Sequence, residues 1–226
     1  MVGVMTLHRT TIGKKVIMAI TGAVWIGYLF MHMYGNLKIF TGMEHFNEYA
    51  AGLRTLGAPI FGYAHLLWIA RIVLILTLVP HIAWALDLSR RNRISSRDVK
   101  YAVHKKLRAN PANRTMIFGG IAVALFIVYH LMHLTFGVAH SSFEGHDAYH
   151  NVVAGFQNPI ISVVYLIALV AIAFHLYHGT WSLFQTLGII NKNYNGIIKG
   201  LAWIVALIIP IGFALVPLAV MFGIVS

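Results

Sequence analysis

Five long apolar segments, separated by polar connections, are the dominant pattern along the chain. They cover about residues 15–40, 63–88, 115–140, 159–186 and 197–223. A helix needs about 20 apolar residues to cross a hydrocarbon core of roughly 30 Å, and each segment is long enough. Pro210 and Pro217 fall inside the fifth segment, where a membrane helix tolerates them with a kink. The pattern predicts an all-α integral membrane protein, a bundle of five transmembrane helices.

Lysine and arginine are distributed unevenly between the connections. Fourteen of the seventeen lie on one side of a five-span bundle: Arg9, Lys14, Lys15, Arg90, Arg91, Arg93, Arg97, Lys100, Lys105, Lys106, Arg108, Arg114, Lys192 and Lys199. Basic connections favour the cytoplasmic side, so we expect the N-terminus inside and the C-terminus outside. The basic run at 90–114 serves as a topology signal that contacts anionic lipid, as a docking surface for a soluble cytoplasmic partner, or as both.

Composition supports the membrane location and limits the chemistry. The 226 residues are 59% hydrophobic and only 10% charged, with a mean hydropathy of +0.76, which is too little charge for a soluble domain. The net charge of +11 follows the topology pattern, so we do not expect nucleic acid as a partner. Because there is no cysteine, disulfides and thiolate-bound iron–sulfur clusters are excluded within this chain. We find no sequence repeat or linker and expect one domain, 1–226, in the inner (cell) membrane.

Histidine is the unusual residue inside the predicted spans, because ionisable side chains at membrane depth are rare and usually functional. Spans one and three run outward, and they carry His32, His130 and His133 in their outer halves. Spans two and four run inward, and they carry His81, His175 and His178 in their inner halves. The two sets should lie roughly 4–9 Å either side of the midplane. Depth does not choose within either doublet, whose members are three residues apart on one helix face.

Facing histidines at two depths favour haem. Neutral imidazole is an axial ligand of haem iron, and two such ligands make a six-coordinate site suited to electron transfer. Zinc and copper usually gather ligands at one depth with carboxylate or thiolate help, and a proton relay would include Asp or Glu. We therefore expect two haem sites across the bilayer, with Gly119 either leaving room for the inner macrocycle or serving plain helix packing. A haem-free membrane scaffold is the alternative.

Five segments together carry a resemblance to a known family. They are IGKKVIMAITG (12–22), MHMYGNLKIF (31–40), FNEYAAGLRTLG (46–57), YHLMHLTFG (129–137) and FHLYHGTWSLFQTLG (174–188). As a set they resemble the cytochrome b558 membrane-anchor subunit of succinate dehydrogenase, which is related to the di-haem membrane subunit of quinol:fumarate reductase. In that family each of the first four spans supplies one axial histidine. The resemblance implies the pairs His32–His130 for an outer haem b and His81–His175 for an inner haem b, in agreement with the depths.

Other polar residues near these positions become candidates through the resemblance. His133 and His178 are candidates to bond a haem propionate or a quinone oxygen, or are satisfied polar residues between helices. Arg71 is a candidate partner for a propionate, or extends its charge to the outer interface. The candidates for the border of a quinone pocket lie in the first outer connection: His45, Glu48, Tyr49 and Arg54.

The resemblance also implies a division of labour. A cytoplasmic flavoprotein oxidises succinate, an iron–sulfur subunit carries the electrons to the membrane, and this chain anchors both and helps to reduce a membrane quinone, expected to be menaquinone. The chain has neither a dinucleotide-binding glycine fingerprint nor cysteine, so we expect a subunit that does not itself oxidise succinate. Ala173 stands where some fumarate reductase relatives carry an acidic residue, which favours succinate oxidation. The alternatives are the membrane subunit of a quinol:fumarate reductase or of another quinone-linked dehydrogenase.

Overall fold

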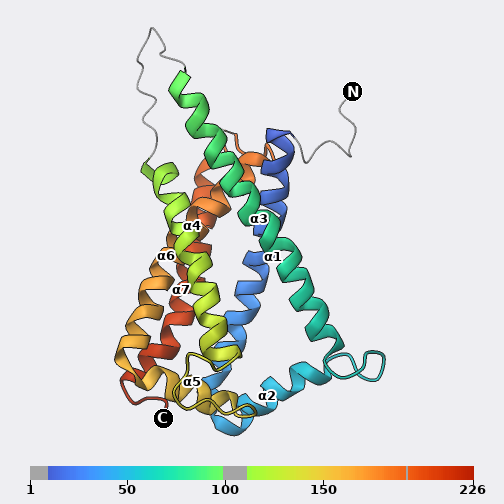
Figure 1. Ribbon diagram of the computed structural model, residues 1–226, viewed down its shortest axis with the longest axis vertical. Coiled ribbons are helices and arrows are strands. Elements are labelled where there is room, and N and C mark those ends of the chain that lie inside the picture. Colours follow the sequence, from blue (N-terminus) through green and yellow to red (C-terminus); the bar gives the residue numbers. More distant parts are fainter. Residues whose placement is uncertain (1–9, 99–110, 192) are drawn as a thin grey trace.

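Five long helices run along the length of the molecule (Figure 1). The structure is a computed structural model that describes residues 10–98, 111–191 and 193–226. The long helices are α1 (Thr11–Leu37), α3 (His65–Asp98), α4 (Pro111–His130), α6 (Pro159–Thr186) and α7 (Asn195–Met221). All five contain a stretch long and apolar enough to cross a membrane. The prediction of an all-α bundle with five spans is therefore confirmed.

Four short elements complete the described chain, and all lie toward one end of the bundle. They are the 3₁₀ turn η2 (Lys38–Thr41), α2 (Met43–Thr55), the π-helical turn η3 (Leu131–Thr135) and α5 (Ala148–Gln157). The helices α2 and α5 contact each other and lie across the bundle at the lower end of Figure 1. Gly42, with a φ of 97°, makes the turn from η2 into α2, a conformation that glycine adopts without steric cost.

Side-chain caps define the start of three helices. The Thr10 hydroxyl accepts a hydrogen bond from the Gly13 N–H at 3.0 Å and starts α1. The Asp147 carboxylate accepts from the His150 N–H at 2.8 Å and starts α5. The Asn158 side chain starts α6, with Pro159 in the first helical position. Such residues satisfy the backbone N–H groups that the first turn leaves unpaired.

The helices α6 and α7 form the most extensive contact, and α1 and α4 pack against α6. Small residues of α7 make this close packing possible, since Ala202 and Ala206 are almost fully buried. A second buried cluster at the lower end joins Ile39, Phe46 and Phe156 with residues of α6 and α7. By contrast, α3 packs mainly against α1 and leans away from the other long helices (Figure 1).

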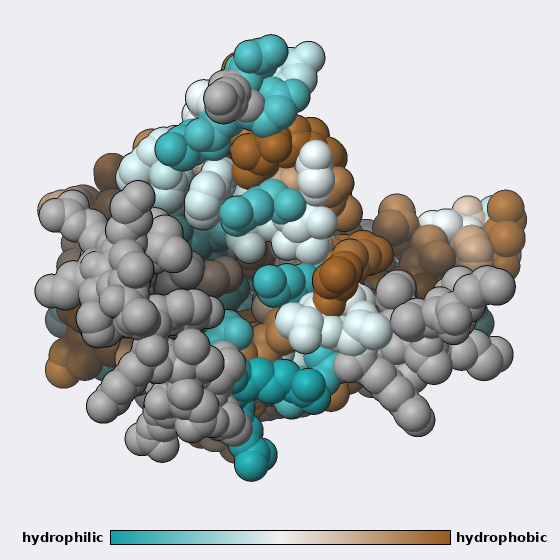
Figure 2. Space-filling model, turned by 90° about the horizontal axis from the view of Figure 1, so that it is seen from above, coloured by the Kyte–Doolittle hydropathy of each residue, from teal (hydrophilic) through white to brown (hydrophobic). Residues whose placement is uncertain are grey.

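An ion pair joins α1 and α3 at the end of the bundle where α1 begins. The Lys14 ammonium is 2.5 Å from the Asp87 carboxylate, and the Arg91 guanidinium donates to the same carboxylate at 2.9 Å. From the sequence, Lys14 is expected only as one of the positive charges that set the membrane topology. In the structure its side chain is buried. Figure 2, which views this end of the bundle, shows hydrophilic side chains gathered there.

The long helices expose large apolar side chains to their surroundings. Ile75 and Leu76 of α3 and Ile204 of α7 are more than half exposed, as expected for surfaces in contact with lipid. The start of α1 and the end of α7 lie at opposite ends of the bundle (Figure 1), as an odd number of spans requires. The assignment of the cytoplasmic side stays a prediction. Arg9, Lys192 and most of the basic run at 90–114 lie outside the residues whose side chains are described.

Candidate cofactor site: two facing histidine pairs

The outer pair brings together His32 of α1 and His130 of α4. Their ring centroids are 5.9 Å apart and the ring planes are inclined by 77°. Aromatic side chains surround the pair. Tyr28, one turn earlier on α1, stacks on His32 at 5.3 Å, and Phe213 of α7 lies 5.5 Å from the same ring. Phe126 lies 5.9 Å from His130. The packing of these rings restricts both imidazoles to a narrow range of orientations.

The inner pair brings together His81 of α3 and His175 of α6, with ring centroids 6.3 Å apart. A glycine of a neighbouring helix lies beside each ring. A Cβ atom on Gly22 of α1 would be 3.5 Å from the His81 Cε1 atom, and one on Gly120 of α4 would be 3.5 Å from the His175 Cε1 atom. Each glycine precedes the outer histidine of its own helix by ten residues. At about 1.5 Å per residue, the two pairs are therefore roughly 15 Å apart along the bundle.

Thr21 fixes the protonation of His81. The Thr21 hydroxyl donates its single proton to the carbonyl oxygens of its own helix, at 2.8 Å to Ile17 and 3.2 Å to Met18. The same oxygen is 3.0 Å from the His81 Nδ1 atom, so it accepts a hydrogen bond from Nδ1–H. A neutral imidazole protonated at Nδ1 keeps its lone pair on Nε2. The Nε2 atom of His81 is therefore the one able to bind a metal.

The spacing within both pairs fits a metal held between two imidazoles. A metal–imidazole bond is about 2 Å and the nitrogen lies about 1 Å from the ring centre, so the centroids should be roughly 6 Å apart. The observed separations are 5.9 Å and 6.3 Å. Among the described residues, no three or more His, Cys, Asp or Glu side chains gather to hold a metal ion. Two protein ligands suit haem iron, whose macrocycle supplies the other four, better than a bare zinc or copper ion.

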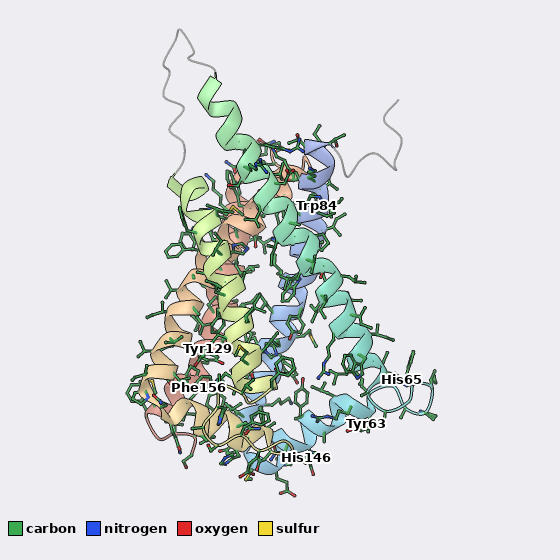
Figure 3. All side chains as sticks on the ribbon, viewed as in Figure 1. Tyr63, His65, Trp84, Tyr129, His146 and Phe156 are labelled. Atoms are coloured by element: carbon green, nitrogen blue, oxygen red, sulfur yellow. The ribbon has the colours of Figure 1, made fainter. Side chains whose placement is uncertain are left out.

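The π-helical turn η3 gives His130 and His133 different surroundings. The backbone N–H of Phe136 donates to the Leu131 carbonyl five residues earlier, at 2.8 Å. In an α-helix this bond would reach back only four residues, so the π turn contains one residue more. His133 lies within this turn and is fully buried, with its Nδ1 atom 2.9 Å from the Tyr165 hydroxyl, whereas His130 contacts the ring of His32. Figure 3 shows Tyr129 of α4 and Phe156 of α5, whose rings both contact His133, toward the end that carries α5.

His178 and Arg71 have simpler surroundings. The His178 ring is half-buried and lies 5.2 Å from the ring of Tyr177, its neighbour in the chain. The Arg71 guanidinium lies over the ring of Trp68, one turn earlier on α3, at 4.9 Å from the centroid. This cation–π contact holds the Arg71 charge near the start of α3. A role for either side chain toward a haem stays a prediction.

The four candidates for a quinone pocket all lie on α2, but they do not converge on one point. His45 and Glu48 are exposed and face each other at 3.5 Å. Arg54 donates to the Ala50 carbonyl oxygen of its own helix at 3.1 Å. Tyr49 is directed toward α1, because a Cβ atom on Gly35 would be 2.9 Å from its hydroxyl. Tyr49 is therefore the one that reaches the helix that carries His32.

Four residues of the site were missed from the sequence: Thr21, Gly22, Gly120 and Tyr165. Gly120, not the expected Gly119, lies against an inner histidine, while a Cβ atom on Gly119 would meet nothing within 4 Å. The spacing of ten residues between a glycine and the outer histidine, shared by α1 and α4, is the signal that would have found both glycines. The two hydroxyl residues have no such signal, because Thr and Tyr are common in membrane helices.

A comparison with protein families adds independent evidence. Residues 113–223 match the model of the succinate dehydrogenase/fumarate reductase transmembrane subunit. The chain belongs to this family. The match includes one histidine of each pair, His130 and His175. Neither a comparison with curated proteins nor one with solved structures gave a significant match. This family member, with its five spans, is a multi-pass membrane protein and a subunit of a complex of the succinate:quinone oxidoreductase type.

Proposed function

We propose that this family member is the cytochrome b558-type membrane anchor of a succinate dehydrogenase. In this proposal it passes electrons from an iron–sulfur subunit to a membrane quinone, for which we propose menaquinone. The observation that carries the proposal is the pairing of four histidines from four spans at two depths, with centroid separations of 5.9 Å and 6.3 Å. The family match supports the same kind of complex.

The two pairs would each hold one haem b, His32 with His130 and His81 with His175. Haem held by two imidazoles supplies one-electron transfer without an open position for oxygen. The chain's own contribution is to orient the ligands and to exclude water from them. Tyr28, Phe126 and Phe213 do this at the outer pair by packing against the imidazoles.

The partners follow from the family and from the charge pattern. We propose that the iron–sulfur subunit, and through it the flavoprotein subunit, docks on the end where α1 begins. That end carries the hydrophilic surface of Figure 2, and the inner pair is the nearer one to it, because Gly22, which lies beside His81, precedes His32 along α1. Arg90 in the last third of α3 is exposed there and available to acidic groups of a partner, whereas the neighbouring Arg91 is paired with Asp87. On the opposite side we propose Tyr49 as the first candidate at the quinone site, because Gly35 and His32 lie within one turn of each other on α1.

The test is to purify the chain together with its partner subunits and to count haem. We expect two b haems per chain and succinate-dependent reduction of a menaquinone analogue. Absence of a b-type absorbance band would refute the haem assignment, and one haem per chain would refute the two-site arrangement. Faster fumarate reduction by quinol than succinate oxidation by quinone would favour the quinol:fumarate reductase alternative. Activity with another electron donor would favour a different dehydrogenase.

A further inference from the structure

One tyrosine hydroxyl on α6 lies between two imidazoles of the α4–η3 segment. The Tyr165 Oη atom is 2.9 Å from the His133 Nδ1 atom and 3.4 Å from the His130 Nδ1 atom. Tyr165 and His133 are 6% and 0% exposed, so water does not compete for these bonds. His130 is the imidazole of these two that faces a paired histidine, His32. The second imidazole, His133, requires an explanation of its own.

The protons of this group follow from counting together with the proposed haem. A tyrosine hydroxyl has one proton, so it donates to one Nδ1 atom and accepts from the other. A haem on the His130 Nε2 atom requires the proton of that imidazole at Nδ1, so the hydroxyl donates to the His133 Nδ1 atom and leaves the buried Nε2–H of His133 without a hydrogen-bond partner. The hydroxyl oxygen in turn accepts from His130 Nδ1–H, which leaves the lone pair of His130 on Nε2. The opposite arrangement would protonate His130 at Nε2, the atom needed for a metal.

The side chains around His133 hold its imidazole in one orientation. Its ring stacks between Tyr129, with a centroid distance of 5.7 Å, and His140, at 4.9 Å. A Cβ atom on Gly155 of α5 would be only 2.8 Å from the His133 Cε1 atom, so only glycine fits there without displacing the ring. His140 is itself held, because its Nε2 atom donates to the Asn151 carbonyl oxygen at 2.9 Å. The outer connection therefore determines where His133 lies and holds its Nδ1 atom where it can accept the Tyr165 proton.

We propose that Tyr165, oriented by His133, is a positioning residue for His130 at the outer haem. It accepts the Nδ1–H hydrogen bond, which sets the tautomer of His130 and turns its Nε2 atom toward His32. This inference rests on the proposed haem function. A hydrogen bond from the second nitrogen makes an imidazole a stronger donor to the metal, which stabilises the ferric state. The bond should therefore lower the reduction potential of the outer haem and leave that of the inner haem unchanged.

The variant Tyr165→Phe tests the proposal, because it removes the hydroxyl and keeps the ring. Potentiometric titration of the purified complex should give a higher potential for the outer haem and the wild-type value for the inner haem. A tenfold change in the ferrous-to-ferric equilibrium corresponds to a shift of about 59 mV for one electron. The matched control is Tyr129→Phe, whose ring also contacts His133 and Tyr165 but which should leave both potentials unchanged. Potentials like wild type in the Tyr165 variant, equal shifts of both haems, or the same shift in the control would overturn the inference.

A second pair of variants decides the matter if Tyr165→Phe does not retain its outer haem. The variant His133→Asn keeps an acceptor near the position of Nδ1, whereas His133→Leu removes it. The asparagine variant should keep the outer potential, and the electron paramagnetic resonance signal of the outer ferric haem, closer to wild type than the leucine variant does. Equal effects of the two would show that His133 acts only by filling space and would overturn the inference. Wild-type protein without two b haems would instead refute the function on which it rests.

Discussion

Replacing the four paired histidines one at a time tests the assignment of ligands. His32→Ala and His130→Ala should each remove the outer haem, and His81→Ala and His175→Ala should each remove the inner one. Each single variant should therefore lose half of the b-type absorbance, because a haem that loses one of its two axial imidazoles is no longer held on both faces. A haemochrome count and the redox difference spectrum of the purified complex measure both the number and the identity of the haems retained.

Double variants make this prediction quantitative. The two pairs are separated by ten residues along a helix, which at about 1.5 Å per residue places them roughly 15 Å apart. Sites more than about 7–10 Å apart that share no partner usually behave independently. Thus His32→Ala with His130→Ala should still retain one haem, whereas His32→Ala with His81→Ala should retain none.

Loss of different haems from His32→Ala and His130→Ala would refute the pairing of these two histidines. A His178→Ala variant that loses a haem retained by His175→Ala would refute the choice of ligand on α6, since the structure places His175 opposite His81.

Three further predictions concern the contacts that hold the site together. Gly155→Ala should lower the free energy of unfolding by about 1–3 kcal/mol, because the added methyl group would clash with the buried ring of His133. Thermal unfolding in detergent measures this change. The control is Gly52→Ala, since a Cβ atom on Gly52 would meet nothing within 4 Å. Burial alone would raise the pKa of Asp147, but hydrogen bonds from the His150 N–H and the Asn47 amide lower it below its usual value. Its stabilising contribution is therefore complete above the ordinary carboxyl pKa of about 3.9 and is lost as the pH falls through the lowered value; melting temperatures between pH 7 and pH 3 should drop less steeply for Asp147→Asn, and an unchanged slope would contradict the sign. Lys14→Met should accelerate loss of the inner haem in detergent, because it breaks the pair that joins α1 to α3, while Lys15→Met, which replaces an exposed lysine, should not.

The fold could be predicted from the sequence because lipid imposes a simple rule. Each span must contain about 20 apolar residues, so hydropathy alone locates the five apolar spans to within about five residues, although α3 continues as a helix to Asp98. The depths of the histidines follow from the same rule, since the position of His32 or His81 along a span converts directly into height. The structure then places each of these residues opposite a histidine at the same height.

The details of the site could not be predicted, because they depend on rotation and not on height. Three residues along an ideal helix separate His130 from His133 too little to tell which one faces α1. In the structure His130 contacts His32, whereas His133 lies within the π-helical turn η3, and an extra residue in one helical turn leaves no mark in the hydropathy pattern. The hydrogen bond from His81 to Thr21 likewise depends on how α3 is rotated against α1, which is a property of the packed bundle.

The two histidine pairs arise from one arrangement that the chain uses twice, although no repeat is visible in the sequence. The helices α1, α2 and α3 follow one another as span, surface helix and span, and α4, α5 and α6 do the same. In both halves the first span carries a glycine ten residues before its histidine, and that glycine lies beside the histidine of the second span. In both halves, too, a hydroxyl of one span faces the Nδ1 atom of a histidine on the other, Thr21 with His81 and Tyr165 with His130. Each pair then takes one histidine from each half, so neither half alone can complete a site, and the two sites form only when the halves pack against each other.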